Sequence, residues 1–169
     1  MSYGSCTRVG VCLVTLPAVR TTDGGELVVL FVGTPPIDLQ QACRDICTDP
    51  VDIDVVTDGR AAIRRLTASS TSPTAYPRPD LVLLQCDFEL PDGMTVLHAI
   101  KSSPQLGAVP VVVLDTDDCD AETAYETGGN AYLKAPQTTE EYVDLIGSIE
   151  EFWFDWAQYP AEYLYSDRS

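Results

Sequence analysis

The residues of this sequence that could do chemistry are its carboxylates, its cysteines and one histidine. Four aspartates crowd one short stretch, at Asp115, Asp117, Asp118 and Asp120. Alternate oxygen ligands in a loop can bind Ca²⁺, but this stretch lacks the glycine and the distal glutamate of an EF-hand loop. Because the chain holds 26 acidic residues, we expect a solvated acidic loop here and no metal site.

The six cysteines lie at positions 6, 12, 43, 47, 86 and 119, and no two of them form a C-x-x-C pair. Cys43 and Cys47 would share one helix face, but two thiols supply only half of a zinc site. His98 has no acidic or cysteine partner near it in the sequence. We therefore expect buried structural cysteines in a reducing compartment and an ordinary histidine.

Another candidate is the polar sequence that follows the apolar run 81–84. Gln85, Cys86 and Asp87 come directly after four aliphatic residues, and a Pro/Asp/Gly turn follows at 91–93. An apolar run without alternation is typical of a strand buried on both faces of a parallel sheet. Ligands bind such sheets at the carboxyl ends of the strands. Gln85 leads this candidate site, and an amide cannot act as a carboxylate nucleophile.

The elements that must position these residues alternate between strand and helix patterns. Strands are predicted at 27–32, 51–57, 81–84, 109–114 and 131–133. Residues with helical spacing follow each strand, and Asp58 and Thr138 fit as helix N-caps. The pattern predicts an α/β protein with a flavodoxin-like, doubly wound sheet of five parallel strands in the order 2-1-3-4-5.

The predicted domain covers residues 26–160, with an N-terminal extension at 1–25 and a C-terminal tail at 161–169. The extension contains one strand-like run at 9–16. Because the first strand of the domain is central, this extra strand or arm must join a sheet edge, reach a second subunit or stay loose.

Charge restricts the partners of this chain. A net charge of −16 with only two lysines repels nucleic acid and anionic membrane surfaces, so neither is an expected partner. No apolar run is long enough to span a bilayer, and the run at 9–16 lacks a signal-peptide cleavage site. We expect a cytoplasmic protein, and the excess of acid over lysine indicates the salt-rich cytoplasm of a halophilic archaeon.

Several segments resemble the receiver domain of two-component response regulators. The resemblance lies in 79–84, in Asp92-Gly93, in 109–114, and in 130–133 with Pro136. Residues 75–80, which lead into the third predicted strand, and residues 148–153, near the end of the last predicted helix, are similar to those of small single-domain regulators partnered with phytochromes and of their haloarchaeal relatives. This resemblance, from residue 26 to about 160, implies a CheY-like fold, a role in phosphorelay signal transduction, and protein partners such as a histidine kinase.

The resemblance also places the receiver's phosphorylation machinery on this sequence. The acidic pair that binds metal falls on Gly33 and Thr34, and the phosphoacceptor falls on Gln85. The hydroxyl after strand four falls on Asp115, and the lysine falls on Ala135. All five positions depart from the family pattern. They imply a degenerate pseudo-receiver, which is a phosphorylation-independent interaction module with no enzymatic activity, no metal and no cofactor.

Two other interpretations stay open. A two-residue slip would make Asp87 the phosphoacceptor, with Lys134 and Thr116 beside it and Mg²⁺ as cofactor, although the acidic pair would still be missing. Alternatively, the crevice could bind a nucleotide or flavin as flavodoxins do. The turn 33–36 offers few N–H groups to a phosphate because two of its residues are prolines.

Aromatic residues crowd the end of the sequence, among them Phe152, Trp153, Trp156 and Tyr159. Consecutive aromatic residues at 152–154 point in successive directions around a helix, so they cannot all face one core. Because aromatic side chains are enriched at interfaces, we expect these four residues to form the contact of a symmetric homodimer. The similar phytochrome-type regulators associate through their C-terminal region, which favours this interpretation. The alternative is a tail that folds back over its own sheet.

Overall fold

The computed structural model describes residues 26–35, 38–47, 50–71, 77–86, 93–116 and 120–152. The predicted extension at 1–25 and tail at 161–169 lie outside these ranges. The elements are β1 Leu27–Val32, α1 Leu39–Ile46, β2 Val51–Val56, α2 Gly59–Thr71, β3 Leu81–Gln85, α3 Gly93–Ser102, β4 Val111–Asp115, α4 Ala121–Glu126, β5 Ala131–Lys134 and α5 Thr139–Glu151. Over these residues no helix is both long and apolar enough to cross a bilayer.

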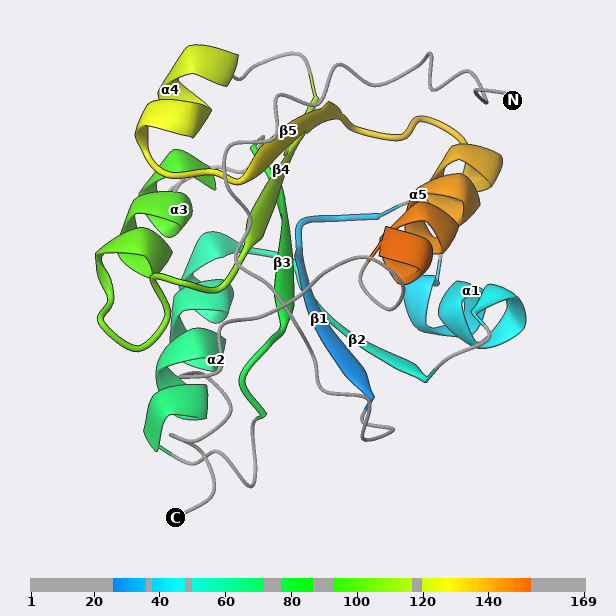
Figure 1. Cartoon of the computed structure of the whole chain (residues 1–169), viewed down its shortest axis with the longest axis horizontal. Helices are drawn as coiled ribbons and strands as arrows, with labels where there is room; N and C mark the ends of the chain where they lie inside the picture. Colours follow the sequence, from blue (N-terminus) through cyan, green and yellow to red (C-terminus); the bar gives the residue numbers. More distant parts are fainter. Residues whose placement is uncertain are drawn as a thin grey trace, which may run out of the picture.

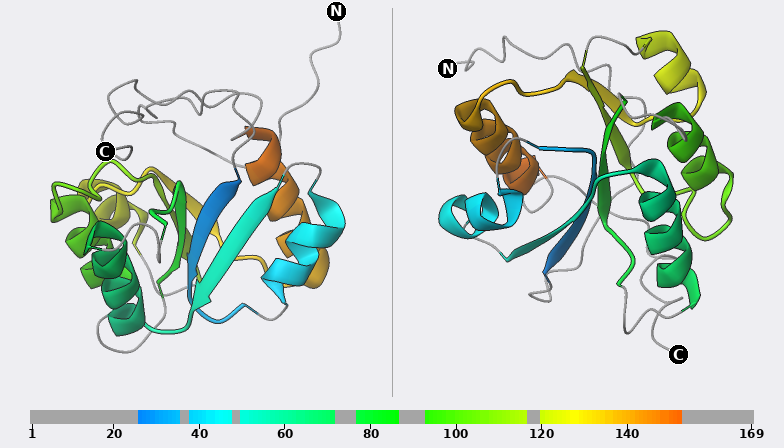
Figure 2. Two further views of the ribbon diagram at one scale, coloured as in Figure 1. Left: turned by 90° about the horizontal axis from the view of Figure 1, so that it is seen from below. Right: turned by 180° about the vertical axis from the view of Figure 1, so that it is seen from behind.

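The five strands form one parallel sheet in the order β2-β1-β3-β4-β5, which confirms the predicted fold. Val32 at the end of β1 lies opposite Leu84 of β3, and Gln85 lies opposite Leu114 of β4. Helices α1 and α5 cover one face of the sheet, and α2, α3 and α4 cover the other (Figures 1 and 2). The carboxyl ends of the strands therefore meet along one edge between two helical layers.

Each face of the sheet buries its own apolar cluster, because alternate residues of a strand point to opposite faces. Val29 and Phe31 belong to the cluster beneath α1 and α5, whereas Leu30 and Val32 belong to the cluster beneath α2, α3 and α4. Burying an aliphatic side chain of this size contributes about 1.5–3 kcal/mol. Both faces need apolar residues, which is why the central strands have no alternation in their sequence.

Two predicted caps begin their helices. The Asp58 carboxylate accepts a hydrogen bond from the Ala61 N–H at 2.7 Å, and the Thr138 hydroxyl accepts from the Glu141 N–H at 3.2 Å. In a capping box, the Glu141 carboxylate would accept a hydrogen bond from the N–H of the cap residue Thr138. Here it accepts instead from the N–H of the preceding residue, Gln137, at 2.6 Å. Both caps satisfy N–H groups that a helix leaves without internal partners.

Two predicted boundaries were wrong. The sequence predicts a helix at 61–66 and a Ser/Thr/Pro-rich loop at 68–79, whereas α2 continues to Thr71. The Thr67 hydroxyl donates to the Ile63 carbonyl at 2.8 Å, so the helix satisfies this side chain internally. Strand β4 begins at Val111 and not at residue 109, because Pro110 has no N–H to donate to the sheet.

Candidate functional site

Four of the five strands end close to the predicted site residues. Gly33 and Thr34 follow β1, Gln85 closes β3, and Asp115 closes β4. Ala135 follows β5, and its N–H donates to the Asp115 carbonyl at 2.7 Å. The sheet thus brings residues from distant parts of the sequence to one edge, as the fold requires.

Gln85 is the buried polar residue of the described core, with 6% of its surface exposed. Its Oε1 atom accepts a hydrogen bond from the Thr34 N–H at 2.7 Å. Its Nε2 atom donates to the Tyr142 hydroxyl at 3.3 Å. Both ends of the amide are therefore occupied, as burial of a polar group requires. The amide joins the β1–α1 connection to α5 across the end of β3.

The conformation of Gly33 leaves room for this amide. Its φ angle is +145°, a value that side-chain-bearing residues rarely adopt. A Cβ atom at this position would overlap the Gln85 amide oxygen and would lie 2.7 Å from Cδ of the same side chain. Gly33 and Gln85 therefore fit each other: the long side chain at 85 fills space that any side chain at 33 would need.

A second glycine brings α3 close to the site. A Cβ atom on Gly93 would lie 2.8 Å from the Gln85 carbonyl oxygen and 2.9 Å from Cys86 Cα. Both atoms belong to backbone, so they cannot move aside as a side chain can. Gly93 thus allows α3 to begin directly against the end of β3.

The remaining predicted residues have different surroundings. Ala135 is buried among the core residues beneath α1 and α5, with 3% of its surface exposed. Lys134 is exposed and lies opposite the half-buried Asp115 in the β4–β5 pairing. The hydroxyl oxygen of Thr116 is buried and has no hydrogen-bond partner among the described residues. Asp87, the alternative phosphoacceptor, lies outside the described residues.

The described residues at this edge do not fit Mg²⁺. This ion prefers carboxylate oxygens, and Asp115 is the one acidic residue at the described strand ends that form the site. Nowhere in the described ranges do three His, Cys, Asp or Glu side chains gather as a metal site would require. The Thr34 N–H, one of the few donors of the turn 33–36, is already donated to Gln85 Oε1.

Of the acidic loop, Asp120 is described and caps α4. Its carboxylate accepts hydrogen bonds from the Thr123 N–H at 2.9 Å and from the Thr123 hydroxyl at 2.8 Å. These bonds, the backbone one foremost, lower the pKa of the exposed Asp120 carboxyl. Asp117 and Asp118 lie outside the described residues.

The cysteine expectation was wrong at one position. Cys86, next to Gln85, forms a disulfide, and its partner is not among the described residues. Sequence spacing does not reveal which cysteines a fold brings together, because a disulfide depends on the distance and direction between two residues in space. Cys43 and Cys47 are thiols, and Cys43 is buried, as expected. His98 is exposed and lies 3.3 Å from the Ser102 hydroxyl, which agrees with an ordinary role.

Two residues that matter were not singled out from the sequence. From the sequence alone, Tyr142 is one of the apolar residues of the helical pattern that follows Thr138. In the structure its buried ring lies beside Phe31, and its hydroxyl accepts a hydrogen bond from Gln85 Nε2. Lys101 donates to the carbonyls of Gly107 and Val109 and to Asn130 Oδ1. Burial lowers the Lys101 pKa to about 8. A polar atom on an otherwise apolar helix face was the available signal in both cases.

The predicted interface residues are described only in part. Phe152 is half-buried and packs against the core beneath α1 and α5. Trp153, Trp156 and Tyr159 lie outside the described residues. The homodimer therefore stays a prediction.

Comparisons with known proteins agree on one family. No protein-family model matches the chain. Response regulator Rcp1 of Synechocystis sp. is 31% identical over 138 residues, which cover 79% of this chain and 93% of that protein. The probable methanogenesis regulatory protein FilR2 of Methanothrix harundinacea is 36% identical over 110 residues, covering 64% of this chain and 70% of that protein.

Solved structures lead to the same family. The phosphorylated cyanobacterial phytochrome response regulator RcpA superposes with a TM-score of 0.69 at 30% identity, covering 81% of this chain and all of that chain. The Mn²⁺-bound form of Rcp1 gives a TM-score of 0.66 at 30% identity, covering 79% and 99% of the two chains. The parallel sheet, the strand order and these relatives together establish that the chain belongs to the response regulators of two-component signalling and has their CheY-like receiver fold.

Proposed function

We propose that this chain is a pseudo-receiver, an interaction module in two-component-type signal transduction that works without being phosphorylated. The buried Gln85 amide, with hydrogen bonds to Thr34 and Tyr142, carries this proposal. Phosphoryl transfer needs an attacking carboxylate and metal ligands with negative charge. The described strand ends supply an amide, a glycine and a threonine in their place.

Two relatives have been solved in states that this chain is proposed not to adopt. RcpA has been solved in a phosphorylated form, and Rcp1 has been solved with Mn²⁺ bound. In the present chain, the residue facing the crevice from β3 is uncharged and both of its polar ends are engaged. A hydrogen-bonded amide of this kind favours one conformation of the site in the absence of phosphate. The proposed partners are proteins of the signalling pathway, a histidine kinase among them, and the proposed location is the cytoplasm.

The test is incubation with Mg²⁺ and a small acyl phosphate, followed by intact-mass measurement of the full chain. RcpA, treated in parallel, serves as the positive control. We expect no added phosphate on this chain under conditions that phosphorylate RcpA. Acid-labile phosphate on the chain at comparable occupancy would overturn the proposal.

A second candidate function is that of a phosphoaccepting regulator that uses Asp87. The observation in its favour is the Thr116 hydroxyl, whose oxygen is buried without a hydrogen-bond partner among the described residues. A hydroxyl of this kind, together with Lys134, suits contacts to phosphoryl oxygens. In the same mass experiment this candidate requires phosphate on the natural chain and none on the Asp87→Asn variant.

A further inference from the structure

The acidic residues of this chain avoid two continuous segments. Residues 59–79 and 93–114 contain none of the 26 aspartates and glutamates. The same segments contain five of the ten arginines and lysines, and the only histidine. They include α2 and α3, which lie side by side on one face of the sheet (Figure 1). Arg65 pairs with Asp54 at 2.6 Å and Lys101 is half-buried, so Arg60 and Arg64 are the exposed arginines of these two helices in a chain with a net charge of −16.

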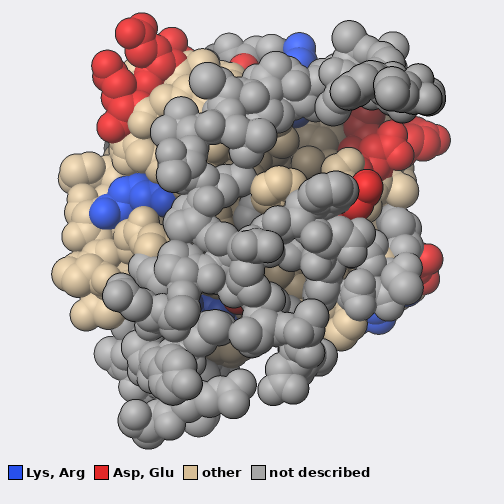
Figure 3. Space-filling model, viewed as in Figure 1, with Lys and Arg blue, Asp and Glu red and all other residues tan. Residues whose placement is uncertain are grey.

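The exposed positions of these helices differ from those of the other helices. Exposed residues of α2 include Arg60, Arg64 and Thr67, and those of α3 include Thr95 and His98. Helices α4 and α5 instead expose acidic residues, at Glu122, Glu126, Glu140, Glu141 and Asp144. Figure 3 shows this separation, with red atoms over α4 and the start of α5 and none over the tan and blue surface of α3.

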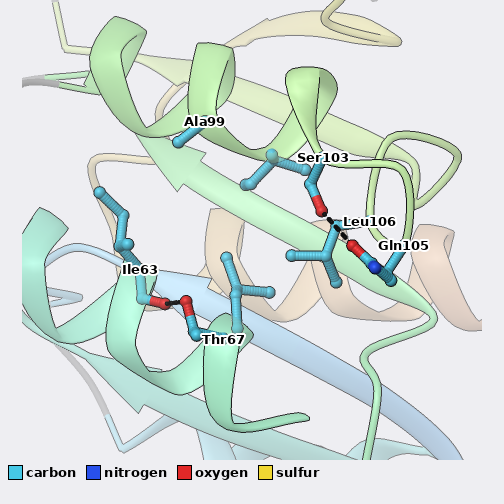
Figure 4. Close-up of a pocket in the computed structure, with 8 residues that line it drawn as sticks. Ile63, Thr67, Ala99, Ser103, Gln105 and Leu106 are labelled. Carbon is cyan, nitrogen blue, oxygen red and sulfur yellow. Dashed lines mark hydrogen bonds between the residues drawn. The ribbon is translucent and has the colours of Figure 1, made fainter. Parts of the chain in front are cut away.

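A groove of about 290 Å³ lies between the middle of α2 and the last turn of α3 (Figure 4). Its apolar lining consists of the buried Leu66, Ile100 and Leu106 and the half-buried Ile63 and Ala99. Thr67, Ser103 and Gln105 add polar groups to its wall. This volume lies at the lower limit of pockets that hold a whole small ligand, about 300–1,000 Å³. It suits the anchoring side chains of a protein partner better than a cofactor.

Cationic residues lie next to the apolar lining on α2. Arg60 and Arg64 are one turn apart, and Ile63 lies three residues after the first of them. Arg64 in turn lies three residues before the lining residue Thr67. Residues three apart are neighbours on a helix surface, so each arginine lies next to one residue of the α2 side of the groove. His98 is exposed on α3, directly before the lining residue Ala99.

We infer that the α2–α3 groove binds an acidic, amphipathic helix of a partner protein. The groove between two neighbouring helices accepts apolar residues spaced as on one helix face. The arginines beside it attract carboxylates, whereas the acidic surface of the remaining chain repels them, so an acidic helix is directed to this site. A basic helix would instead be drawn to the exposed acids of α4 and α5.

This surface is separate from the Gln85 crevice. Gln85 lies at the carboxyl ends of the strands, and α2 and α3 run back from that edge, so the groove beside the middle of α2 and the last turn of α3 lies away from it. Binding at the groove does not depend on whether the chain accepts phosphate. The inference therefore goes beyond the proposed function and can fail or succeed independently of it.

The test uses the full chain and a fluorescein-labelled helical peptide with leucines at helical i, i+3, i+4 and i+7 spacing and glutamates at its other positions. A second peptide carries lysines in place of the glutamates. Fluorescence anisotropy at about 0.15 M salt measures affinity, and amide chemical shifts of the ¹⁵N-labelled chain locate the contact. We expect saturable binding of the glutamate peptide, with shifts confined to the α2–α3 groove.

The double variant Arg60→Glu/Arg64→Glu should weaken this binding about tenfold. The matched control is Arg44→Glu, which reverses an exposed arginine on α1, on the other face of the sheet. It should change the affinity by less than about twofold. Circular dichroism establishes that each variant is folded. Absence of saturable binding, equal binding of the lysine peptide, or equal weakening by Arg44→Glu would each overturn the inference.

Discussion

The Gln85 side chain occupies the space that a side chain at position 33 would need, and Gly33 holds a φ angle of +145° beside it. The two residues lie at the ends of neighbouring strands, 52 positions apart in the sequence. Gly33 and Gln85 both depart from the receiver pattern, and the two departures explain each other. A longer side chain at 85 needs glycine at 33, and a glycine at 33 would leave a void without a long side chain at 85.

Gly33→Ala should destabilise the fold by about 2–4 kcal/mol, because its methyl group meets the Gln85 amide and its φ angle is strained. Urea unfolding followed by circular dichroism measures the change. The matched control is Gly147→Ala in α5, where an added Cβ meets nothing within 4 Å. That variant should stabilise the fold by about 0.5–1 kcal/mol, because alanine favours the helix.

The Gly33→Ala effect has two separable parts. Shortening residue 85 in the double variant Gly33→Ala/Gln85→Ala removes the collision but leaves the backbone strain. The double variant should therefore lose less stability than the two single variants added together, by about 1 kcal/mol or more. Strict additivity would show that the two side chains do not compete for space.

Gln85→Met keeps the length of the side chain and removes both of its hydrogen bonds. It should cost about 1–2 kcal/mol, and Tyr142→Phe should cost about 0.5–1.5 kcal/mol. Because one bond is shared, the double variant should lose less than the sum of the single variants. Independent effects in this cycle would contradict a direct link between β3 and α5.

Gly93→Ala should destabilise the fold by about 1–3 kcal/mol. Its added methyl meets the backbone of Gln85 and Cys86, which cannot move without shifting the strand. Gln85→Ala should therefore fail to rescue it, in contrast to its effect on Gly33→Ala. Rescue by Gln85→Ala would show that the contact involves the side chain. Thermal unfolding of Gly93→Ala, Gln85→Ala and the double variant distinguishes the two outcomes.

Lys101 predicts a dependence of stability on pH. Burial lowers its pKa from the ordinary value of 10.5 to about 8, so between these values the unfolded chain binds more protons than the folded one. The contribution of Lys101 to folding stability therefore rises as the pH increases from about 8 to 10.5. Urea unfolding over this window, for the natural chain and Lys101→Met, measures it.

The difference between these two chains isolates the lysine, because the other titrating groups are common to both. The free energy of unfolding of the natural chain, relative to that of Lys101→Met, should increase with pH. A flat difference, or one that decreases, would show that the hydrogen bonds from Lys101 to Gly107, Val109 and Asn130 outweigh its burial.

Most of the fold could be predicted from the sequence because the apolar runs are unambiguous. The strand beginning at Leu81 has no polar residue until Gln85, and both faces of it are buried. The end of α2 could not be predicted, because serine and threonine are common in loops and only the three-dimensional context shows Thr67 bonded within a helix. Pro110 was included in a strand because its neighbours are valines.

The site could be located but not assembled from sequence. The end of β3 was identified by its change from aliphatic to polar residues at Gln85. The contact with Tyr142, 57 positions later, depends on how α5 lies against the sheet, and no local pattern encodes that placement. The carbonyl contacts of Lys101 depend in the same way on segments that meet only in the folded chain, and no local pattern shows that Cys86 forms a disulfide.

An amide has no proton to gain or lose near neutral pH, and it attracts no counterion. The bridge from Thr34 through Gln85 to Tyr142 is therefore expected to keep the same strength from mildly acidic to neutral pH and in concentrated brine. An ion pair between a carboxylate and a lysine in these places would change in strength with pH and with salt concentration. The geometry that Gln85 imposes on α5 is thus constant, whatever the surrounding chemistry of the cell.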